Sequence, residues 1–283
     1  MIKQGLRQSV KDGKEYNFGA IFGYAKLDDI PKVFRIGPVV SMKEQKDSDF
    51  CVGMGFSTAS EYQEEVELSP EWFFAKCKEL TGKVDEWGTD IKTGGKVACS
   101  SGFIEQKDAP FSLQNKDRDF LADINNWPDL NAQGLIHKKS NYFFVEKSYG
   151  YDLFDAMRAA IWKFKDEKRT LVTGANWKSS WLGNGYISED YPDEQGFGHC
   201  FVIVGWNEYG LVAQVTGDGV IGDQGFFYFP RSVVNKEFVF DTIMLKDLPQ
   251  NLTHEDAILL SKQARSNWFI ALLHSIFSFF FHK

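Results

Sequence analysis

Two residues of the chain could together perform covalent catalysis, Cys51 and His199. A thiolate is a strong nucleophile, and a neighbouring imidazole can take up and return the proton that the reaction moves. Cys51 follows the polar, turn-rich stretch Asp47-Ser48-Asp49 and begins an apolar run that is compatible with a helix. Because Ser48 or Asp49 can cap such a helix, we expect Cys51 in its first turn, where the helix dipole favours the thiolate. A free cysteine alone is more often a small buried residue, so other features must support this role.

His199 stands at the start of an apolar strand, in the stretch Gly198-His199-Cys200. It is either an ordinary residue of a strand end or a base that faces a thiol on another lobe and lowers the pKa of that thiol. Gln45 lies six residues before Cys51 and can offer its side-chain amide to an oxyanion. The remaining histidines lie in loop or tail contexts without comparable flanks: His137, His254, His274 and His282.

The elements around these residues indicate an α+β protein in two lobes, helix-rich first and strand-rich later. Helices are expected from Cys51 onward, over Pro70–Leu80 with Ser69 as the cap, near Lys92–Ser101 and over Asp152–Lys165. Strands are expected at residues 170–175, 200–205, 211–216 and 225–230, the second and third joined by a hairpin at residues 207–210. We therefore expect an N-terminal arm (1–43), a helical lobe (44–150), a β-rich lobe (151–250) and a C-terminal helical, apolar tail (251–283).

Composition excludes several classes of protein. The net charge of −7 argues against a nucleic-acid partner, because phosphate binding needs a basic surface. The four cysteines include no CxxC pair, so neither a disulfide framework nor a cysteine zinc site is expected, and no motif indicates a cofactor. The N-terminus has no apolar segment typical of a signal peptide. These features predict a reducing, intracellular location, the cytoplasm.

The motifs together resemble the papain-like (family C1) cysteine peptidases, of the divergent kind found in bacteria and their viruses. That family has a glutamine, then six residues later a cysteine that opens the central helix, then a Phe-Ser or Phe-Ala pair. Gln45, Cys51 and Phe56-Ser57 carry this pattern here. The catalytic histidine of the family follows about 130–150 residues downstream in a Gly-His-Ala context, which Gly198-His199-Cys200 matches.

The resemblance implies a two-lobe papain-like fold and the hydrolysis of peptide bonds in a peptide or protein substrate. Cys51 would attack the carbonyl carbon and His199 would move the proton. Gln45 and the Cys51 backbone N–H would hold the oxyanion.

The sequence departs from the family at the residue that orients the histidine. An asparagine is expected about sixteen residues after the histidine, and Val215 stands there. Gln214 is the nearest polar residue and a possible third member of the site, although a shift of one residue turns a side chain to the other face of a strand. No inhibitory propeptide is recognisable. Two alternatives follow. One is a catalytically weak or inactive papain-like module that serves as a binding or structural component, for example in a viral particle, which would make the protein virion-associated; the other is a Cys-His amidase that acts on cell-wall peptides.

The C-terminal tail carries the apolar run Trp268–Phe281 after a helix start at Thr253 and Asp256. Fourteen helical residues span about 21 Å, which is short of the roughly 30 Å hydrocarbon core, so a membrane-spanning helix is not expected. Residues 265–283 are either a membrane-interface or partner-binding helix, or a terminal helix packed on the protein's own core.

Overall fold

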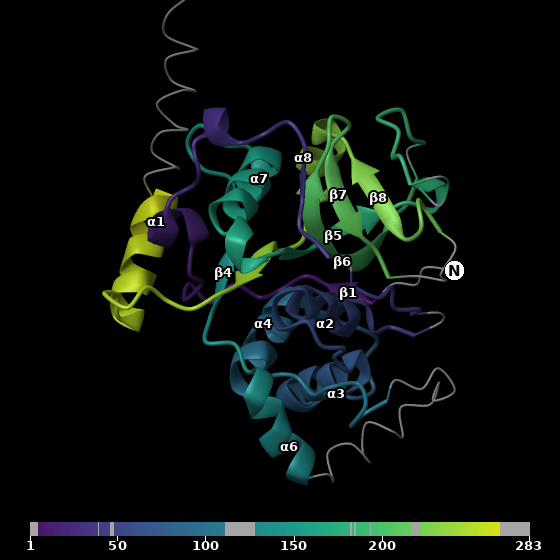
Figure 1. The fold of residues 1–283 in the computed structure, drawn as a ribbon, viewed down its shortest axis with the longest axis vertical. Helices are drawn as coiled ribbons and strands as arrows, with labels where there is room; N and C mark the ends of the chain where they lie inside the picture. The colour runs from purple at the N-terminus through teal and green to yellow at the C-terminus, as the bar shows by residue number, and fades with distance from the viewer. Residues whose placement is uncertain are drawn as a thin grey trace, which may run out of the picture.

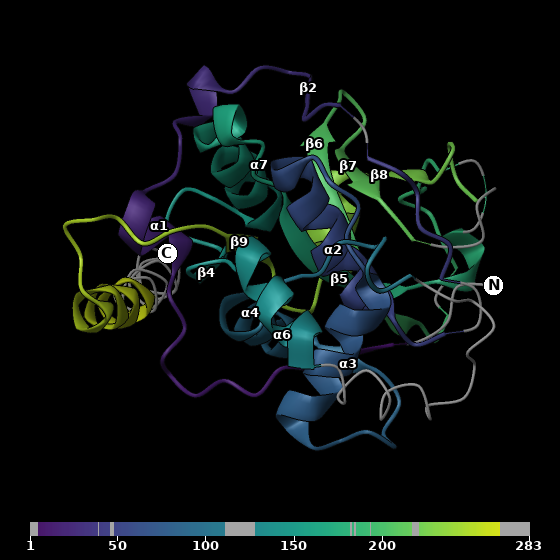
Figure 2. The same cartoon turned by 60° about the horizontal axis from the view of Figure 1, so that its bottom comes forward.

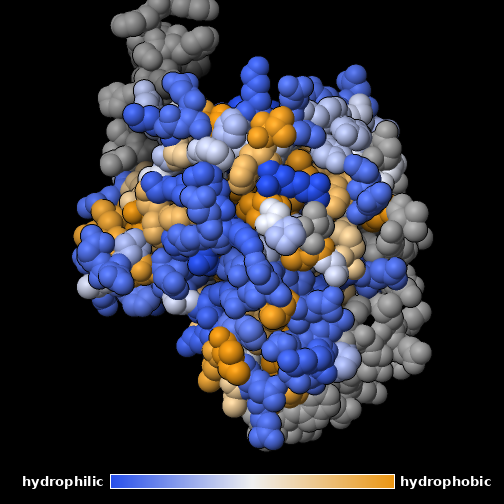
Figure 3. All heavy atoms as spheres, viewed as in Figure 1, coloured by the Kyte–Doolittle hydropathy of each residue, from blue (hydrophilic) through white to orange (hydrophobic). Residues whose placement is uncertain are grey.

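Helices and sheet are segregated into two parts of the molecule, which meet along helix α2 and strand β6 (Figure 1). The computed structural model describes residues 5–38, 40–45, 48–110, 128–181, 183, 185–192, 194–216 and 221–266. The face in this view is mainly hydrophilic, with hydrophobic atoms in separate patches (Figure 3). The α+β class predicted from the sequence is confirmed.

The helical lobe is built around aromatic side chains. Phe73 stacks between Phe56 and Phe103, with ring centroids 5.2 and 4.6 Å apart, and Trp72 is fully buried. Ser69 caps its helix by accepting the Trp72 N–H, as predicted. The helices are α2 (Cys51–Glu64), α3 (Pro70–Thr81), α4 (Ile91–Ser100) and α6 (Pro128–Gly134).

One predicted cap is wrong. Helix α2 does begin at Cys51, but its N-cap is Phe50 and no side chain caps it. The Ser48 hydroxyl instead donates to the Gln45 carbonyl oxygen at 2.8 Å, and the Asp49 carboxylate accepts the Gly88 N–H at 2.5 Å. Both candidate caps are used to shape the approach to Cys51 and to bind the turn before α4.

The second lobe is a seven-stranded sheet in the order β4-β9-β5-β6-β7-β8, with β2 paired to β6. All its pairings are antiparallel, and the predicted hairpin joins β6 to β7 through Asn207 and Gly210. Strand β4 belongs to this sheet through its pairing with β9, although it precedes residue 151, the expected start of the β-rich lobe. The strands are β2 (Phe34–Arg35), β4 (Tyr142–Phe144), β5 (Leu171–Trp177), β6 (Phe197–Trp206), β7 (Leu211–Gln214), β8 (Phe226–Phe229) and β9 (Ile243–Leu245), flanked by helices α7 (Leu153–Lys163) and α8 (Arg231–Glu237).

Strand β6 is the centre of the molecule because both of its faces are covered. Residues 198–206 are all buried. On one face the Cys200 side chain packs on Gly55 of α2, and on the other Phe201 stacks on Phe229 with centroids 5.4 Å apart. Such a strand is expected to be a continuous apolar run, which β6 is.

The N-terminal arm runs between the two lobes and then along the outside of the sheet lobe (Figure 1). It forms β1 (Leu6–Arg7), which pairs in parallel with β3 (Thr89–Asp90), then α1 (Phe18–Phe22) and η1 (Leu27–Asp29). A C-terminal helix (residues 254–266) lies beside α1 in both views (Figures 1 and 2). Within the described ranges, no helix is long and apolar enough to cross a membrane. The predicted apolar run Trp268–Phe281 lies outside the described residues.

The contact between α2 and β6 predicts a compensating pair of substitutions. A Cβ atom on Gly55 would lie 2.9 Å from the Cys200 Sγ, so Gly55→Ala should destabilise the fold although alanine is the better helix former. We expect the Gly55→Ala/Cys200→Ala double variant to recover about 1–2 kcal/mol relative to the sum of the single changes. Urea unfolding of the four proteins measures this coupling, and additive effects would contradict the packing described here.

Candidate active site

Cys51 is the first residue of α2 and is fully buried against β6. Its Sγ accepts the backbone N–H of Cys200, the residue that follows His199. The helix start and the strand predicted to carry the two reactive residues are therefore neighbours in space.

His199 lies on β6 opposite Ala175 of β5 and is also fully buried. Its ring meets that of Trp177 edge to face with centroids 5.3 Å apart and lies 6.4 Å from Phe201. Successive side chains leave a strand on opposite faces, so Cys200 faces α2 while the imidazole faces the aromatic residues. The structure brings Cys51 to the backbone next to His199, and direct contact of thiol and imidazole stays a prediction.

Gln45 is buried beside the start of α2, with its amide held on both sides. The amide nitrogen donates to the Ser48 carbonyl oxygen at 2.8 Å, and the amide oxygen accepts the Thr216 hydroxyl at 3.3 Å. Since Thr216 follows β7, this second bond ties the approach of Cys51 to the sheet lobe. Sequence reasoning missed Thr216, whose one signal is a polar side chain two residues after β7, the strand that pairs with β6.

Gln214 was a possible third member of the site, and the structure places its side chain elsewhere. The β6–β7 register pairs Gln214 with Val202, so its side chain leaves the sheet on the face opposite to His199. Its amide oxygen accepts the Tyr62 hydroxyl of α2 at 2.7 Å, and its nitrogen donates to the Val40 carbonyl oxygen at 3.3 Å. Gln214 therefore connects α2 to the segment before it.

Val215 is fully buried, and its N–H donates to the Gly225 carbonyl oxygen at 2.9 Å. Continuing the alternation of β7 by one residue places its side chain on the face of Phe201 and His199. An apolar side chain therefore stands where the family resemblance expects the group that orients the imidazole.

The N-terminal arm passes directly over Cys51. The Gly5 N–H donates to the Gly198 carbonyl oxygen at 3.4 Å, and the Gly5 carbonyl oxygen accepts the Thr89 N–H at 2.9 Å. A Cβ atom on Gly5 would lie 2.9 Å from the Cys51 Sγ and 2.5 Å from the Asp49 carbonyl oxygen. Only glycine fits at this point of the arm.

Glycines also line the wall that receives Leu6, which is almost fully buried. A Cβ on Gly174 would collide with the Leu6 side chain, and one on Gly198 would collide with the Leu6 carbonyl oxygen. A Cβ on Gly88 would collide with the Gly5 carbonyl oxygen. We call the residues that surround Gly5 and Leu6 the arm site: Asp49, Cys51, Gly88, Thr89, Gly174 and Gly198.

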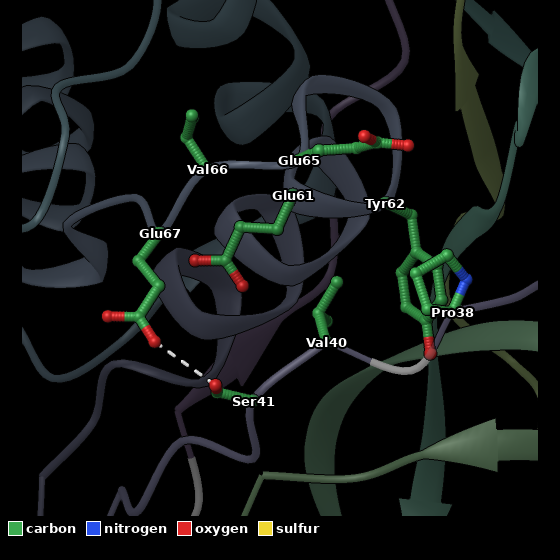
Figure 4. A pocket seen from close by; sticks show the side chains of 8 residues that line it. All are labelled: Pro38, Val40, Ser41, Glu61, Tyr62, Glu65, Val66 and Glu67. Atoms are coloured by element: carbon green, nitrogen blue, oxygen red, sulfur yellow. Dashed lines mark hydrogen bonds between the residues drawn. The ribbon is translucent and has the colours of Figure 1, made fainter.

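A separate cavity of about 250 Å³ lies at the other end of α2 (Figure 4). Glu67 there accepts the Ser41 hydroxyl at 3.0 Å, and buried Glu61 pairs with Lys43 at 2.7 Å. At about 1.5 Å per helical residue, these side chains are roughly 15–20 Å from Cys51. This cavity is therefore not part of the arm site. Among the residues that the structure describes, no group of three or more His, Cys, Asp or Glu side chains could hold a metal ion.

No protein-family model and no curated protein sequence matches the chain. Solved structures do match it. Xylellain, a cysteine protease from Xylella fastidiosa, superposes with a TM-score of 0.71 over 88% of this chain and 99% of its own, at 15% identity. The chain has the fold of the papain-like cysteine proteases.

Two further structures with this fold are proforms or pro-enzymes by name. Digestive procathepsin L 3 of Tenebrio molitor larval midgut has a TM-score of 0.61 at 12% identity, covering 83% of this chain and 76% of its own. Amb a 11, a cysteine protease and ragweed pollen allergen, was determined in its proform and has a TM-score of 0.56 at 17% identity, covering 80% and 70%.

Within this papain-like fold, the pKa of the Cys51 thiol is raised, whereas the sequence predicted a lowered pKa. Burial raises the pKa of Cys51 to about 12; the Cys200 N–H opposes this rise, and the nearby Asp49 carboxylate contributes to it. The expected low pKa is wrong for this arrangement, because the thiol is buried between β6 and Gly5 of the arm, away from water that would stabilise the thiolate. Burial also raises the pKa of Cys99 to about 12 and those of Cys77 and Cys200 well above the ordinary range.

The fit of Gly5 over the thiol predicts that a side chain at this position exposes Cys51. In Gly5→Val the arm cannot remain seated, so we expect alkylation of Cys51 by iodoacetamide at about pH 8 to rise at least tenfold. Peptide mass spectrometry measures the extent of alkylation at each cysteine separately. Val10→Ala is the matched control, because Val10 belongs to the same arm and is 83% exposed.

The same variant should change the pH dependence. A raised pKa means that the protonated thiol stabilises the closed form below its ordinary pKa of 9.0, and that this stabilisation is lost as the pH rises towards about 12. In Gly5→Val the labelling rate should instead titrate with a pKa below 9. Equal rates in Gly5→Val and the native chain across this range would contradict the seating of the arm.

Proposed function

We propose that the chain is a thiol hydrolase that cleaves peptide bonds and is held inactive by its own N-terminal arm. The observation that carries the proposal is that an extended stretch of polypeptide lies across Cys51, bound through its main chain. Any extended peptide could make the same two hydrogen bonds, because its N–H would donate to the Gly198 carbonyl oxygen and its carbonyl oxygen would accept the Thr89 N–H. A substrate would use these two groups once Gly5 has left them.

In the proposed reaction, His199 takes the proton from the Cys51 thiol, and the thiolate attacks the carbonyl carbon of the peptide bond. The oxyanion forms beside the Cys51 N–H at the start of α2 and the Gln45 amide nitrogen. His199 then protonates the departing amine, which leaves an acyl group on Cys51. Water activated by His199 hydrolyses this thioester and returns the free thiol.

Two contacts support the proposed role of Gln45. The Thr216 hydroxyl donates to the amide oxygen, and the amide nitrogen donates one of its two N–H groups to the Ser48 carbonyl oxygen, so the second N–H is the one proposed to bind the oxyanion. Thr216 is therefore a positioning residue for the oxyanion donor. The four cysteines are all unpaired, which is compatible with the predicted cytoplasmic or virion-associated location.

A second candidate is a papain-like module that binds extended peptides without cleaving them. Val215 favours it, because an apolar side chain cannot hold the imidazole of His199 by a hydrogen bond. The third alternative from the sequence, an amidase of cell-wall peptides, has no observation of this structure in its favour.

The proposal predicts that cutting the arm produces activity. A sequence-specific protease site inserted in the exposed stretch near Val10 allows the arm to be cut in the folded chain. We expect the cut protein to hydrolyse fluorescein-labelled casein, while Cys51→Ala abolishes hydrolysis. We expect Gln45→Ala to lower kcat about 10²–10³-fold and His199→Ala about 10²–10⁴-fold.

The outcome also separates the candidates. Peptide binding without turnover, measured by fluorescence anisotropy after Cys51 is shown to be accessible to iodoacetamide, would support the binding module. Neither binding nor turnover by the accessible form would overturn the proposed function.

Val215→Asn tests the missing orienting group. An asparagine on the face of His199 should hold the imidazole and raise kcat of the cut protein severalfold with little change in KM. The buried polar group will cost about 1–3 kcal/mol of stability if it stays unpaired, so thermal unfolding is measured alongside. A folded variant with unchanged kcat would show that His199 is not limited by its orientation.

A further inference from the structure

The arm that covers Cys51 has a second anchor at residues 12–17, on the far side of α4. Its centre is Glu15, which is almost fully buried. Glu15 Oε1 accepts from Lys92 Nζ of α4 at 2.7 Å and from the Asp12 N–H at 2.8 Å. The Lys92 ammonium also donates to the Val10 carbonyl oxygen at 2.9 Å and pairs with Asp12 at 3.0 Å. This anchor fixes the arm to the helical lobe.

The C-terminal helix (residues 254–266) closes over the same anchor from the other side. Arg265 lies 3.6 Å from Glu15 Oε2 and donates to Glu146 at 3.0 Å. Ser261 is fully buried and its hydroxyl oxygen accepts the Asn17 N–H at 2.7 Å. At the start of this helix, His254 hydrogen-bonds the hydroxyl of Tyr16. Residues 15–17 of the arm and the C-terminal helix are thus bound to each other next to α1 (Figure 2).

Between its two anchors the arm is held largely by Lys92 of α4. The Lys92 N–H donates to the Ser9 hydroxyl oxygen at 3.3 Å, the Lys92 ammonium binds the Val10 carbonyl oxygen, and Lys11 pairs with Asp241 at 2.6 Å. A cavity of about 310 Å³ lies beside this stretch, lined by Arg7 and Gln8 of the arm and by Lys83 and Lys96 of the helical lobe. Gly5 and Leu6 have their own contacts in the arm site, and Lys92 couples this part of the arm to residues 12–17, because the same side chain binds Val10 and Glu15.

We propose that the C-terminal helix is a latch for the arm: when this helix leaves residues 15–17, the arm loosens and Cys51 becomes accessible. Opening by release of this helix involves no catalytic event, and its importance for regulation rests on the proposed function. Glu15 is the connecting residue, since it binds Lys92 on one side and Arg265 on the other. A partner that captures the C-terminal helix would open the site, and by linkage a group that displaces the arm from Cys51 would loosen the helix.

The test measures the accessibility of Cys51 in the full-length protein. Arg265→Ala removes the ion pair to Glu15, and Ser261→Ala removes the acceptor of a buried N–H. We expect Arg265→Ala to raise the rate of Cys51 alkylation by iodoacetamide about fivefold and Ser261→Ala about tenfold, since this rate follows the open population. Lys262→Ala is the matched control, because it removes an exposed cation from the same helix.

Cys77 serves as the internal control for unfolding, since it is fully buried in α3 and distant in the chain from the latch. The proposal expects Cys51 to gain reactivity while Cys77 does not. Unchanged Cys51 labelling in both variants would overturn it, as would a parallel rise at Cys77, which reports general destabilisation. An equal rise in Lys262→Ala would overturn it too.

The reciprocal effect gives a second measurement in the native sequence. Alkylation of Cys51 with a bulky maleimide leaves no room for Gly5, so amide hydrogen exchange in residues 254–266 should accelerate. Exchange unaltered by the adduct would contradict the latch. Raised labelling in the latch variants together with no hydrolysis by the cut protein would support the latch and refute the proposed function, so the two fail separately.

Discussion

The contact between the first turn of α2 and the backbone of β6 is the constraint on which the rest of this structure depends. It needs a glycine in the helix and a small side chain on the strand, which Gly55 and Cys200 supply. Because this contact is close, Cys51 reaches the main chain of the opposite lobe and accepts the Cys200 N–H. Every other feature of the candidate site, including the path of the arm, is fixed relative to this contact.

A nucleophile at such a junction is also easy to cover. The thiol is fully buried against β6, and Gly5 of the arm, which has no side chain, packs directly on it. Burial of the thiol raises its pKa, since desolvation outweighs the opposing effects of the helix start and the Cys200 N–H. A single segment can therefore both block access of a substrate to Cys51 and disfavour the thiolate, which is the reactive form.

Local patterns predicted the elements that carry the site. The cap at Ser69, the apolar spacing of α7 and the continuous apolar run of β6 depend on neighbouring residues, so the sequence shows them directly. The wrong cap of α2 has a different origin, because Asp49 bonds to Gly88, which is distant along the chain. Composition alone could not predict that contact.

The arm was visible in the sequence as an irregular segment, but its position was not. Its pairing with Thr89 and Gly198 uses main-chain groups, which every residue has, and the walls that receive it are glycines. Such contacts leave no side-chain pattern to recognise. A shift of one residue in the β6–β7 register would turn the Gln214 side chain to the other face of the sheet. The pairing of Gln214 with Val202 fixes the face, and the sequence does not show that pairing.

Because the arm and the site belong to one chain, closure is a unimolecular event. Dilution leaves the closed fraction unchanged, unlike inhibition by a separate protein. A free peptide must compete with a tethered strand whose effective concentration is of the order of millimolar for a short flexible connection. A peptide present at micromolar concentration would therefore reach Cys51 only when it binds the arm site far more tightly than Gly5 and Leu6 do.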